Sequence, residues 1–267
     1  MDFSRHIKFI DIDCQSHSQR LRYFDWGEGM PLLYLHGWGC DHSIFYPLIE
    51  NLSDQGRHIA IDFPGFGESP RPEAVWGTEE YGDLVYRLIK QYRLEKPMLI
   101  GHSFGARAAL RLARKHPDVL RGMVLIGAAG LKRDVPFRRK IRVKTIRAAA
   151  RLAQRLLPGS MGIKLKDSLY QRIASRDYLN AGEMRSIFVK VVNEDLASLL
   201  PGIQIPTLLI YGENDEETPP SIGKKMNALL PNSRCIELPE FDHFSILDRG
   251  RHQTGHQMRG FLKEIQE

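Results

Sequence analysis

Cysteine is scarce in this sequence of 267 residues, which contains only Cys14, Cys40 and Cys235. Three thiols far apart argue against a disulfide framework and against a cysteine-rich metal site. Long apolar runs are also lacking, because none approaches the roughly 20 residues that a membrane-spanning helix needs. The N-terminal stretch "MDFSRHIKFIDIDCQ" contains no apolar signal-peptide core. We therefore expect a cytoplasmic protein with no transmembrane segment.

Acidic residues are almost absent from residues 131–166, where twelve lysines and arginines accompany a single acid, Asp134. The rest of the chain is net acidic, although the whole sequence has a formal net charge of +6. The positive charge is therefore local, and it does not indicate a protein that binds nucleic acid through its whole surface. Aromatic residues do not interleave with these charges, as they would in a single-strand binding site. We expect no nucleic-acid partner.

Short apolar runs alternate with amphipathic stretches along most of the chain. Continuously apolar runs that end in glycine or polar residues are typical of buried strands, and they begin near residues 31, 58, 97, 120, 207 and 233. Two alternating stretches, 7–12 and 20–24, predict an opening pair of strands. Helical spacing predicts helices over 43–52, 79–92, 105–115, 221–230 and from about 252. This order predicts an α/β fold with a mostly parallel, doubly wound sheet of about eight strands.

The alternation stops between residues 131 and 200, where the pattern is helical and polar. It resumes with the apolar run "PTLLIYGEND". We therefore predict a helical insertion at 131–200 within one core domain made of residues 1–130 and 201–267.

The stretch "PMLIGHSFGARAAL" places Gly-His-Ser-Phe-Gly between a predicted strand and a predicted helix. A strand that enters a helix through Gly-x-Ser-x-Gly is typical of a nucleophile elbow, in which a strained turn presents the serine. Glycines at 101 and 105 leave room for that turn, and the helix N-terminus favours negative charge. We predict Ser103 as a nucleophile and the amide of Phe104 as an oxyanion donor. A glycine-rich turn without chemistry is the alternative.

A serine hydroxyl is a poor nucleophile near pH 7 and needs a base. His243 lies between the last predicted strand and the last predicted helix, in a loop at the same sheet edge as Ser103. Among the other nine histidines, we expect His102 to point away from the site and His36 to stabilise its own loop. His243 is therefore the predicted base.

The base needs a carboxylate that holds its tautomer. Asp215, in "YGENDEETP", follows the predicted strand at 207–211 and is the best candidate. It is crowded by three other carboxylates, which could take its place: Glu213, Glu216 and Glu217. The resulting chain order of serine, aspartate and histidine is the one expected for an elbow of this kind.

A second oxyanion donor is expected from the loop after the strand that ends at Leu35. The sequence there is "HGWGCD", in which His36 and Gly37 make a tight turn. We predict the backbone amide of Trp38 as that donor, with an ordinary turn and a packed tryptophan as the alternative.

Together these segments resemble the α/β-hydrolase superfamily over nearly the whole chain outside the insertion. "LHGWG" resembles its oxyanion loop, "DFPGFGES" its Asp-x-Pro-Gly-x-Gly-x-Ser loop, "GENDEETP" its acid loop and "DHFSILD" its histidine loop. One departure is Asp242, where many relatives have glycine before the histidine. The resemblance implies that residues 131–200 form a helical cap over the site.

The resemblance also implies acyl transfer. Ser103 would attack a carbonyl while His243 takes its proton, the amides of Trp38 and Phe104 would hold the oxyanion, and water would release the acyl group. A serine nucleophile disfavours the epoxide-hydrolase and dehalogenase chemistry of relatives that use aspartate there. We predict a hydrolase of small or medium carboxylic esters that needs no metal and no organic cofactor.

Two other functions fit the same residues. One is C–C bond hydrolysis, or a lyase or synthase step resembling those of menaquinone-pathway enzymes, on an anionic substrate. Its support is the basic insertion and Arg107, four residues after Ser103, which could contact such a substrate or instead pack against a neighbouring loop. The other is a non-catalytic binder, as in some hormone receptors, and the intact set of serine, histidine and aspartate argues against it.

The basic insertion contains a helical pattern over 137–157 in which Arg147, Arg151 and Arg155 form a row beside an apolar face. A solvated helix that docks by its apolar face is one interpretation. Attraction of anionic substrates and contact with a membrane surface are the others.

Overall fold

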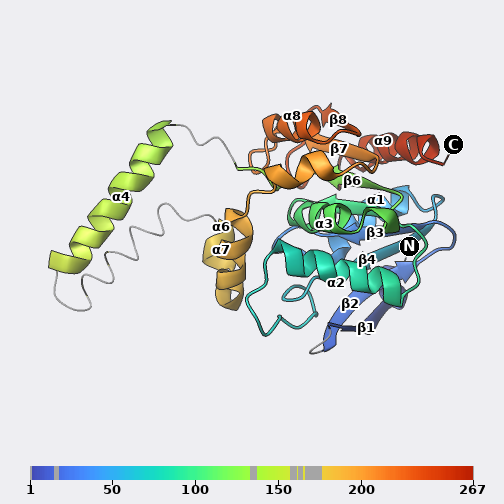
Figure 1. Cartoon of the computed structure of the whole chain (residues 1–267), viewed down its shortest axis with the longest axis horizontal. Helices are drawn as coiled ribbons and strands as arrows, with labels where there is room; N and C mark the ends of the chain where they lie inside the picture. Colours follow the sequence, from blue (N-terminus) through green and yellow to red (C-terminus); the bar gives the residue numbers. More distant parts are fainter. Residues whose placement is uncertain are drawn as a thin grey trace. The chain divides into compact units, whose positions relative to one another are not determined.

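The computed structural model describes residues 2–14, 18–132, 137–156, 161, 165 and 176–266. These residues form an eight-stranded sheet with the order β1-β2-β4-β3-β5-β6-β7-β8 (Figure 1). The strands are β1 Ile7–Asp13, β2 Ser18–Trp26, β3 Pro31–Leu35, β4 Arg57–Ile61, β5 Met98–His102, β6 Gly122–Ile126, β7 Thr207–Gly212 and β8 Ser233–Leu238. The predicted α/β fold with about eight strands is confirmed.

The direction of the strands decides where the loops meet. β2 pairs antiparallel with β1 and β4, whereas every pairing from β4 through β3 to β8 is parallel. Parallel strands have their carboxyl ends at one edge of the sheet, which is where ligands bind in such folds. The loops after β3, β5, β7 and β8 therefore lie along the same edge, although they are far apart in sequence.

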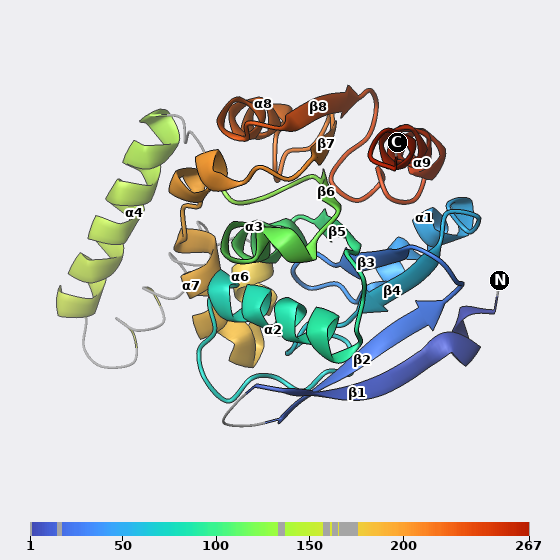
Figure 2. The ribbon, with the colours of Figure 1, turned by 45° about the vertical axis from the view of Figure 1, so that its right-hand side comes forward.

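Helices cover both faces of the sheet (Figure 2). On one face α1 (Tyr46–Asn51) and α9 (Arg251–Glu264) pack together over a cluster that includes Tyr34, Ile100 and Leu208. On the other face α2 (Thr78–Gln91) packs along α3 (Phe104–Lys115), and α8 (Pro220–Leu229) contacts β7 and β8. Short 3₁₀ segments complete the first unit: η1 Phe3–His6, η2 His42–Phe45, η3 Pro117–Val119 and η5 Ala197–Gly202.

The predicted single helix over 43–52 is in fact two segments. The structure has the 3₁₀ turn η2 followed by the short helix α1, which begins at Tyr46. Pro47 lies in the first turn of α1, where its missing N–H needs no partner, so the helix begins there. The preceding turn is closed separately, because the side chain of Asp41 accepts from the backbone N–H of Ser43.

The chain divides into two compact units. The first contains Met1–Leu131 and Lys190–Glu267, and the second contains Lys132–Val189. Residues 190–200, which we expected in the insertion, group with the first unit because Leu196 donates to the carbonyl of Gly130 at 2.8 Å and is fully buried.

The second unit has helices in the part that is described. They are α4 Phe137–Leu156, α6 Arg176–Asn180, η4 Gly182–Met184 and the start of α7 Arg185–Asn193. Residues 133–136, 157–160, 162–164 and 166–175 of the predicted cap lie outside the described residues. Within the described ranges no helix is both long and apolar enough to cross a membrane.

Candidate active site

Ser103 lies between the end of β5 and the start of α3, with φ 50° and ψ −106°. A non-glycine residue rarely adopts this backbone conformation, which costs about 1–3 kcal/mol and is typical of functional sites. The flanking glycines are required by contact: a Cβ at Gly101 would lie 2.9 Å from the backbone of Ala106, and one at Gly105 only 2.0 Å from the carbonyl of Leu35. The local geometry is therefore that of a strained elbow.

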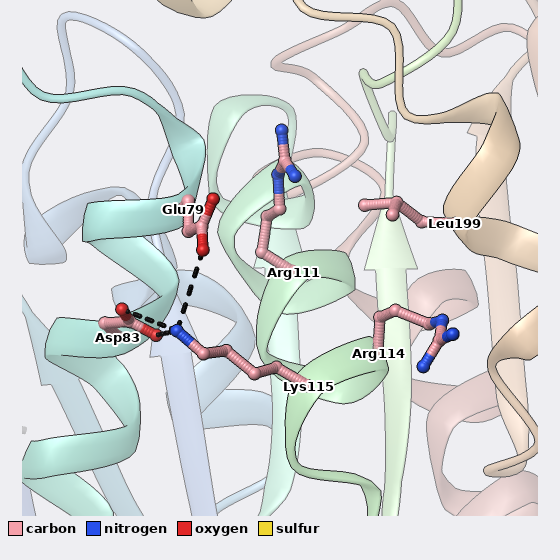
Figure 3. Close-up of a pocket in the computed structure, with 6 residues that line it drawn as sticks. All are labelled: Glu79, Asp83, Arg111, Arg114, Lys115 and Leu199. Atoms are coloured by element: carbon pink, nitrogen blue, oxygen red, sulfur yellow. Dashed lines mark hydrogen bonds and ion pairs between the residues drawn. The ribbon is translucent and has the colours of Figure 1, made fainter.

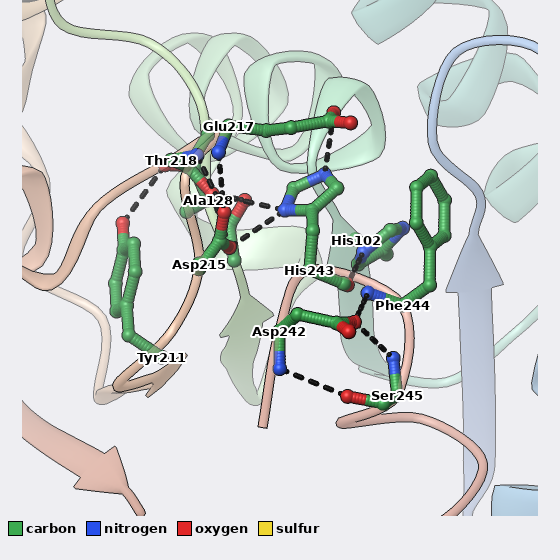
Figure 4. Close-up of polar contacts among 11 residues, drawn as sticks. His102, Ala128, Tyr211, Asp215, Glu217, Thr218, Asp242, His243, Phe244 and Ser245 are labelled. Atoms are coloured by element: carbon green, nitrogen blue, oxygen red, sulfur yellow. Dashed lines mark hydrogen bonds and ion pairs between the residues drawn. The ribbon is translucent and has the colours of Figure 1, made fainter. Parts of the chain in front are cut away.

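His243 and Asp215 come from the loops after β8 and β7, and their side chains meet. His243 Nδ1 donates to Asp215 Oδ2 at 2.7 Å, and both residues are buried. Because Nδ1 is engaged in this way, Nε2 of the neutral ring carries the lone pair that a base needs. Of the four carboxylates in this loop, Asp215 is the one that holds His243 in this way (Figure 4).

Asp215 is held ionised by several donors. Its Oδ1 accepts from the backbone amides of Glu217 at 2.8 Å and Thr218 at 2.7 Å, and Thr218 Oγ1 lies 2.8 Å from Oδ2. Burial alone would raise the pKa of this carboxyl, but the hydrogen bonds from His243 and Thr218 hold the pKa of Asp215 below its ordinary value. Thr218 Oγ1 also lies 2.9 Å from the carbonyl of Gly127, which ties this loop to the end of β6.

The second ring nitrogen of His243 faces a different carboxylate. Nε2 lies 3.7 Å from Oε2 of Glu217, whose side chain is 56% exposed. Among the described residues no hydrogen bond joins this nitrogen to the hydroxyl of Ser103. Catalytic hydrogen bonds are often long before substrate binds, and proton transfer between these two groups stays a prediction. Glu217 was expected only as a rival of Asp215, and its position over Nε2 was not predicted.

His102 does not point away from the site as we expected. Its ring is fully buried, with Nε2 at 2.9 Å from the backbone oxygen of His243, and the two imidazole rings lie 4.7 Å apart. Alternation of side chains applies within a strand, and Ser103 with its positive φ has already left β5. The alternation rule therefore does not predict the direction of His102 relative to the site.

The loop after β3 lies beside Ser103. A Cβ on Gly37 would be 3.4 Å from Cβ of Ser103, and the indole ring of Trp38 lies 5.6 Å from the ring of Phe104. Phe104 opens α3, so its amide has no acceptor within the helix. Both predicted oxyanion donors thus belong to segments that flank Ser103, and their role stays a prediction.

His36 stabilises this loop, as expected. Its Nδ1 donates to the carbonyl of Gly37 at 2.7 Å, and its Nε2 accepts from the amide of Phe63 at 2.9 Å. Burial lowers the pKa of His36. A neutral imidazole is the form that can donate at one nitrogen and accept at the other.

Arg107 is a buried residue of α3 that contacts a neighbouring loop. It is only 7% exposed, and its Nη1 donates to the backbone oxygen of Glu194 at 3.0 Å. Burial lowers the pKa of Arg107 to about 10. This contact corresponds to packing against a neighbouring loop, the alternative to a direct role in substrate binding.

A cleft near the C-terminal end of α3 is separate from these residues. It has a volume of about 300 Å³ and contains no predicted catalytic residue (Figure 3). Lys115 pairs there with Asp83 at 2.8 Å and with Glu79 at 3.6 Å. The cleft is lined by Glu79, Asp83, Arg111, Arg114, Lys115 and Leu199.

One group in the described chain has the side chains of a metal site. Asp41, His42 and Asp62 place one potential ligand atom each within 4.8 Å of one another. However, His42 already uses Nδ1 for Asp62 at 2.6 Å and Nε2 for the hydroxyl of Tyr46 at 2.9 Å. We interpret this group as a structural hydrogen-bond network.

Comparison with known proteins gives a consistent result. Residues 30–250 match the family model described as alpha/beta hydrolase fold. A 2-(acetamidomethylene)succinate hydrolase of Mesorhizobium japonicum is 28% identical over 232 residues, which cover 82% of this chain and 83% of the relative. A pimeloyl-(acyl-carrier protein) methyl ester esterase of Aliivibrio salmonicida is 24% identical over 230 residues, with 81% and 86% coverage.

The fold is also shared with solved structures. A thermophilic esterase from Thermogutta terrifontis aligns with a TM-score of 0.73 and 25% identity, covering 97% of this chain and 99% of that one. A meta-cleavage product hydrolase from Pseudomonas fluorescens aligns with a TM-score of 0.70 and 22% identity over 97% and 99%. At that identity, the second likeness concerns the fold alone.

Proposed function

This chain belongs to the α/β-hydrolase family and is a hydrolase, and we propose that it cleaves small or medium carboxylic esters through an acyl-enzyme on Ser103. The observation that carries the proposal is the buried hydrogen bond between His243 Nδ1 and Asp215, at 2.7 Å, in loops that share a sheet edge with the strained Ser103. A histidine held in this way can act as a base through Nε2.

The proposed reaction has two halves. Ser103 Oγ attacks the ester carbonyl while His243 Nε2 takes the hydroxyl proton, and the imidazolium is stabilised by Asp215. The negative oxygen of the tetrahedral intermediate is held by the amides of Trp38 and Phe104, and the alcohol leaves with the proton from His243. Water then attacks the acyl-enzyme in the same way and releases the acid.

An uncharged ester fits the surroundings of His243 better than an anionic substrate. Among the residues that the structure describes, the charged side chains paired with its ring are two carboxylates, Asp215 at Nδ1 and Glu217 at Nε2. A further anion would be repelled there. Arg107, the residue that supported C–C hydrolysis or a synthase step, donates to Glu194 instead. The named esterase relatives also support ester hydrolysis.

The second unit, Lys132–Val189, is proposed as the cap of this enzyme. Its place in the chain, between β6 and β7, is where the resemblance expects the cap. A cap would select the acyl group by shape, and we assign no side chain of it to the site.

The first test is labelling with a fluorophosphonate probe followed by intact-mass measurement. We expect one adduct on the wild type, one on the control Ser221→Ala, whose serine is exposed at the start of α8, and none on Ser103→Ala. Turnover of neutral p-nitrophenyl esters of two to eight carbons should follow the labelling. Labelling that persists in Ser103→Ala, or a folded wild type without any adduct, would contradict the proposal.

A further inference from the structure

His102 is a buried polar side chain that the proposed reaction does not use. It is the last residue of β5, is covalently joined to Ser103, and is fully buried. Its Nε2 lies 2.9 Å from the backbone oxygen of His243. A carbonyl oxygen only accepts hydrogen bonds, so Nε2 carries the proton and donates it.

The surroundings keep this ring neutral. Burial, together with the neighbouring ring of His243, lowers the pKa of His102 to about 3. The neutral ring is therefore the form present near pH 7, and its contact with a carbonyl oxygen selects the Nε2–H tautomer. The donor to the His243 carbonyl is thus present at this pH.

The other edge of the ring lies against the predicted oxyanion loop. Nδ1 of His102 is buried and has no hydrogen-bond partner among the described residues. A Cβ on Gly37 would lie 2.8 Å from this nitrogen, so the loop after β3 contacts the ring with no room for a side chain. The imidazole of His102 therefore lies between the loop of Trp38 and the loop of His243. Figure 4 shows its contact with His243 as a dashed line.

This arrangement constrains both ends of the proposed proton transfer. The side chain of His243 is held at Nδ1 by Asp215, and its backbone is held by His102. His102 is also the residue that directly precedes Ser103 in the chain. The hydrogen bond from His102 Nε2 to the His243 carbonyl therefore joins the residue next to the nucleophile to the residue that supplies the base.

We propose that His102 is a positioning residue, whose Nε2–H donated to the His243 carbonyl sets the separation between the Ser103 hydroxyl and His243 Nε2. The proposal rests on the proposed function of Ser103 and His243. This role differs from packing because it depends on one donor group, the Nε2–H of His102. A displacement of about 1 Å in such a site can lower the rate about 100-fold.

Three variants test the donor. Glutamine carries an amide N–H at about the position of Nε2, whereas the asparagine amide is shorter and corresponds to Nδ1. We expect His102→Leu and His102→Asn to lower kcat about 10- to 100-fold with KM changed less than about three-fold. His102→Gln should recover kcat to within about five-fold of wild type. Rates of fluorophosphonate labelling should follow the same order.

Two further measurements complete the test. The melting temperature of each variant shows whether it is folded, and the histidine ¹⁵N spectrum of the wild type shows the tautomer of His102. The positioning role would be overturned by equal losses of kcat in His102→Gln and His102→Asn, or by kcat within about two-fold of wild type in a folded His102→Leu. Labelling of Ser103 in the same samples would show that the proposed function still holds. Histidine ¹⁵N shifts that give His102 the Nδ1–H tautomer, or that titrate between pH 5 and 9, would overturn it even if every variant misfolds. No labelling of folded wild type would instead overturn both proposals.

Discussion

The two units of this molecule use ionisable groups in opposite ways. In the first unit ionisable groups are paired at short range: Arg57 with Asp25 at 2.8 Å, Arg111 with Glu194 at 3.1 Å and His243 with Asp215 at 2.7 Å. The second unit has fifteen lysines and arginines but only four acidic residues, and all ten histidines of the chain lie outside it. The sequence of this unit therefore carries a large excess of positive charge.

This difference indicates which unit supports the chemistry and which creates a long-range electrostatic field. Paired, buried groups hold atoms at defined positions, which is what acid–base chemistry needs. An excess of like charge creates a field that acts at longer range and is screened by salt. The proposed reaction uses residues of the first unit alone, and the proposed role of the second is to select substrates.

The largest expected effect comes from breaking the pairing in the first unit. Asp215→Asn should lower kcat about 10⁴-fold, because an amide at this position favours the wrong tautomer of His243. Steady-state turnover of a neutral p-nitrophenyl ester measures this loss. Glu216→Gln, an exposed carboxylate next to Asp215, is the matched control and should stay near the wild-type rate. A large loss in Glu216→Gln together with a near-wild-type rate in Asp215→Asn would show that Glu216, and not Asp215, is the acid.

A smaller effect concerns stability in mild acid. Burial lowers the pKa of His36, of His58 to about 4 and of His102 to about 3. Below the ordinary histidine pKa the unfolded chain therefore binds protons that the folded chain does not, so the free energy of unfolding falls as pH drops. Each histidine contributes up to about 1.4 kcal/mol per pH unit.

Urea unfolding between pH 7 and 5 measures this slope. His58→Phe should reduce it, because the histidine whose pKa burial lowers to about 4 is then removed. Hydrogen exchange at the same pH values should detect the loss in the first unit and not in the second, which has no histidine. A free energy of unfolding that is flat over this range would contradict the lowered pKa values.

The smallest effect is expected from the second unit. A triple change of Arg147, Arg151 and Arg155 to glutamine should alter kcat/KM for a neutral butyrate ester less than about two-fold, because uncharged substrates respond weakly to an electrostatic field. With a hemisuccinate ester, kcat/KM should fall about three- to ten-fold at low salt and lose its dependence on salt. Equal losses with both esters would show that these arginines act on the reaction itself.

Much of the first unit could be predicted from the sequence. Continuous apolar runs indicated the parallel strands, and the loops that follow them indicated Ser103, Asp215 and His243 because carboxyl ends of parallel strands share an edge. All four neighbouring carboxylates follow β7, so chain order alone did not separate Asp215 from the three glutamates, and the contact with His243 Nδ1 favours Asp215. The other inferences depend on chain order, which a sequence states directly.

Side-chain directions were harder to predict. His102 was expected to point away, and Glu217 and Thr218 received no role, because their contacts join loops that are 25 to 141 residues apart. The spacing of Asp215 and Thr218, three residues apart, is a pattern that could have indicated their hydrogen bonds. Nothing local could have indicated that Arg107 donates to Glu194, which follows the second unit in the chain.

The hydrogen bond from Leu196 to the Gly130 carbonyl has a consequence for engineering. It joins the chain just before the second unit to the chain just after it, so the entry and exit of the inserted segment are held together by the first unit itself. Closing a loop of a different length at such a point costs little additional entropy. We therefore expect that the segment between Leu131 and Lys190 can be exchanged for the corresponding segment of a relative without loss of the sheet.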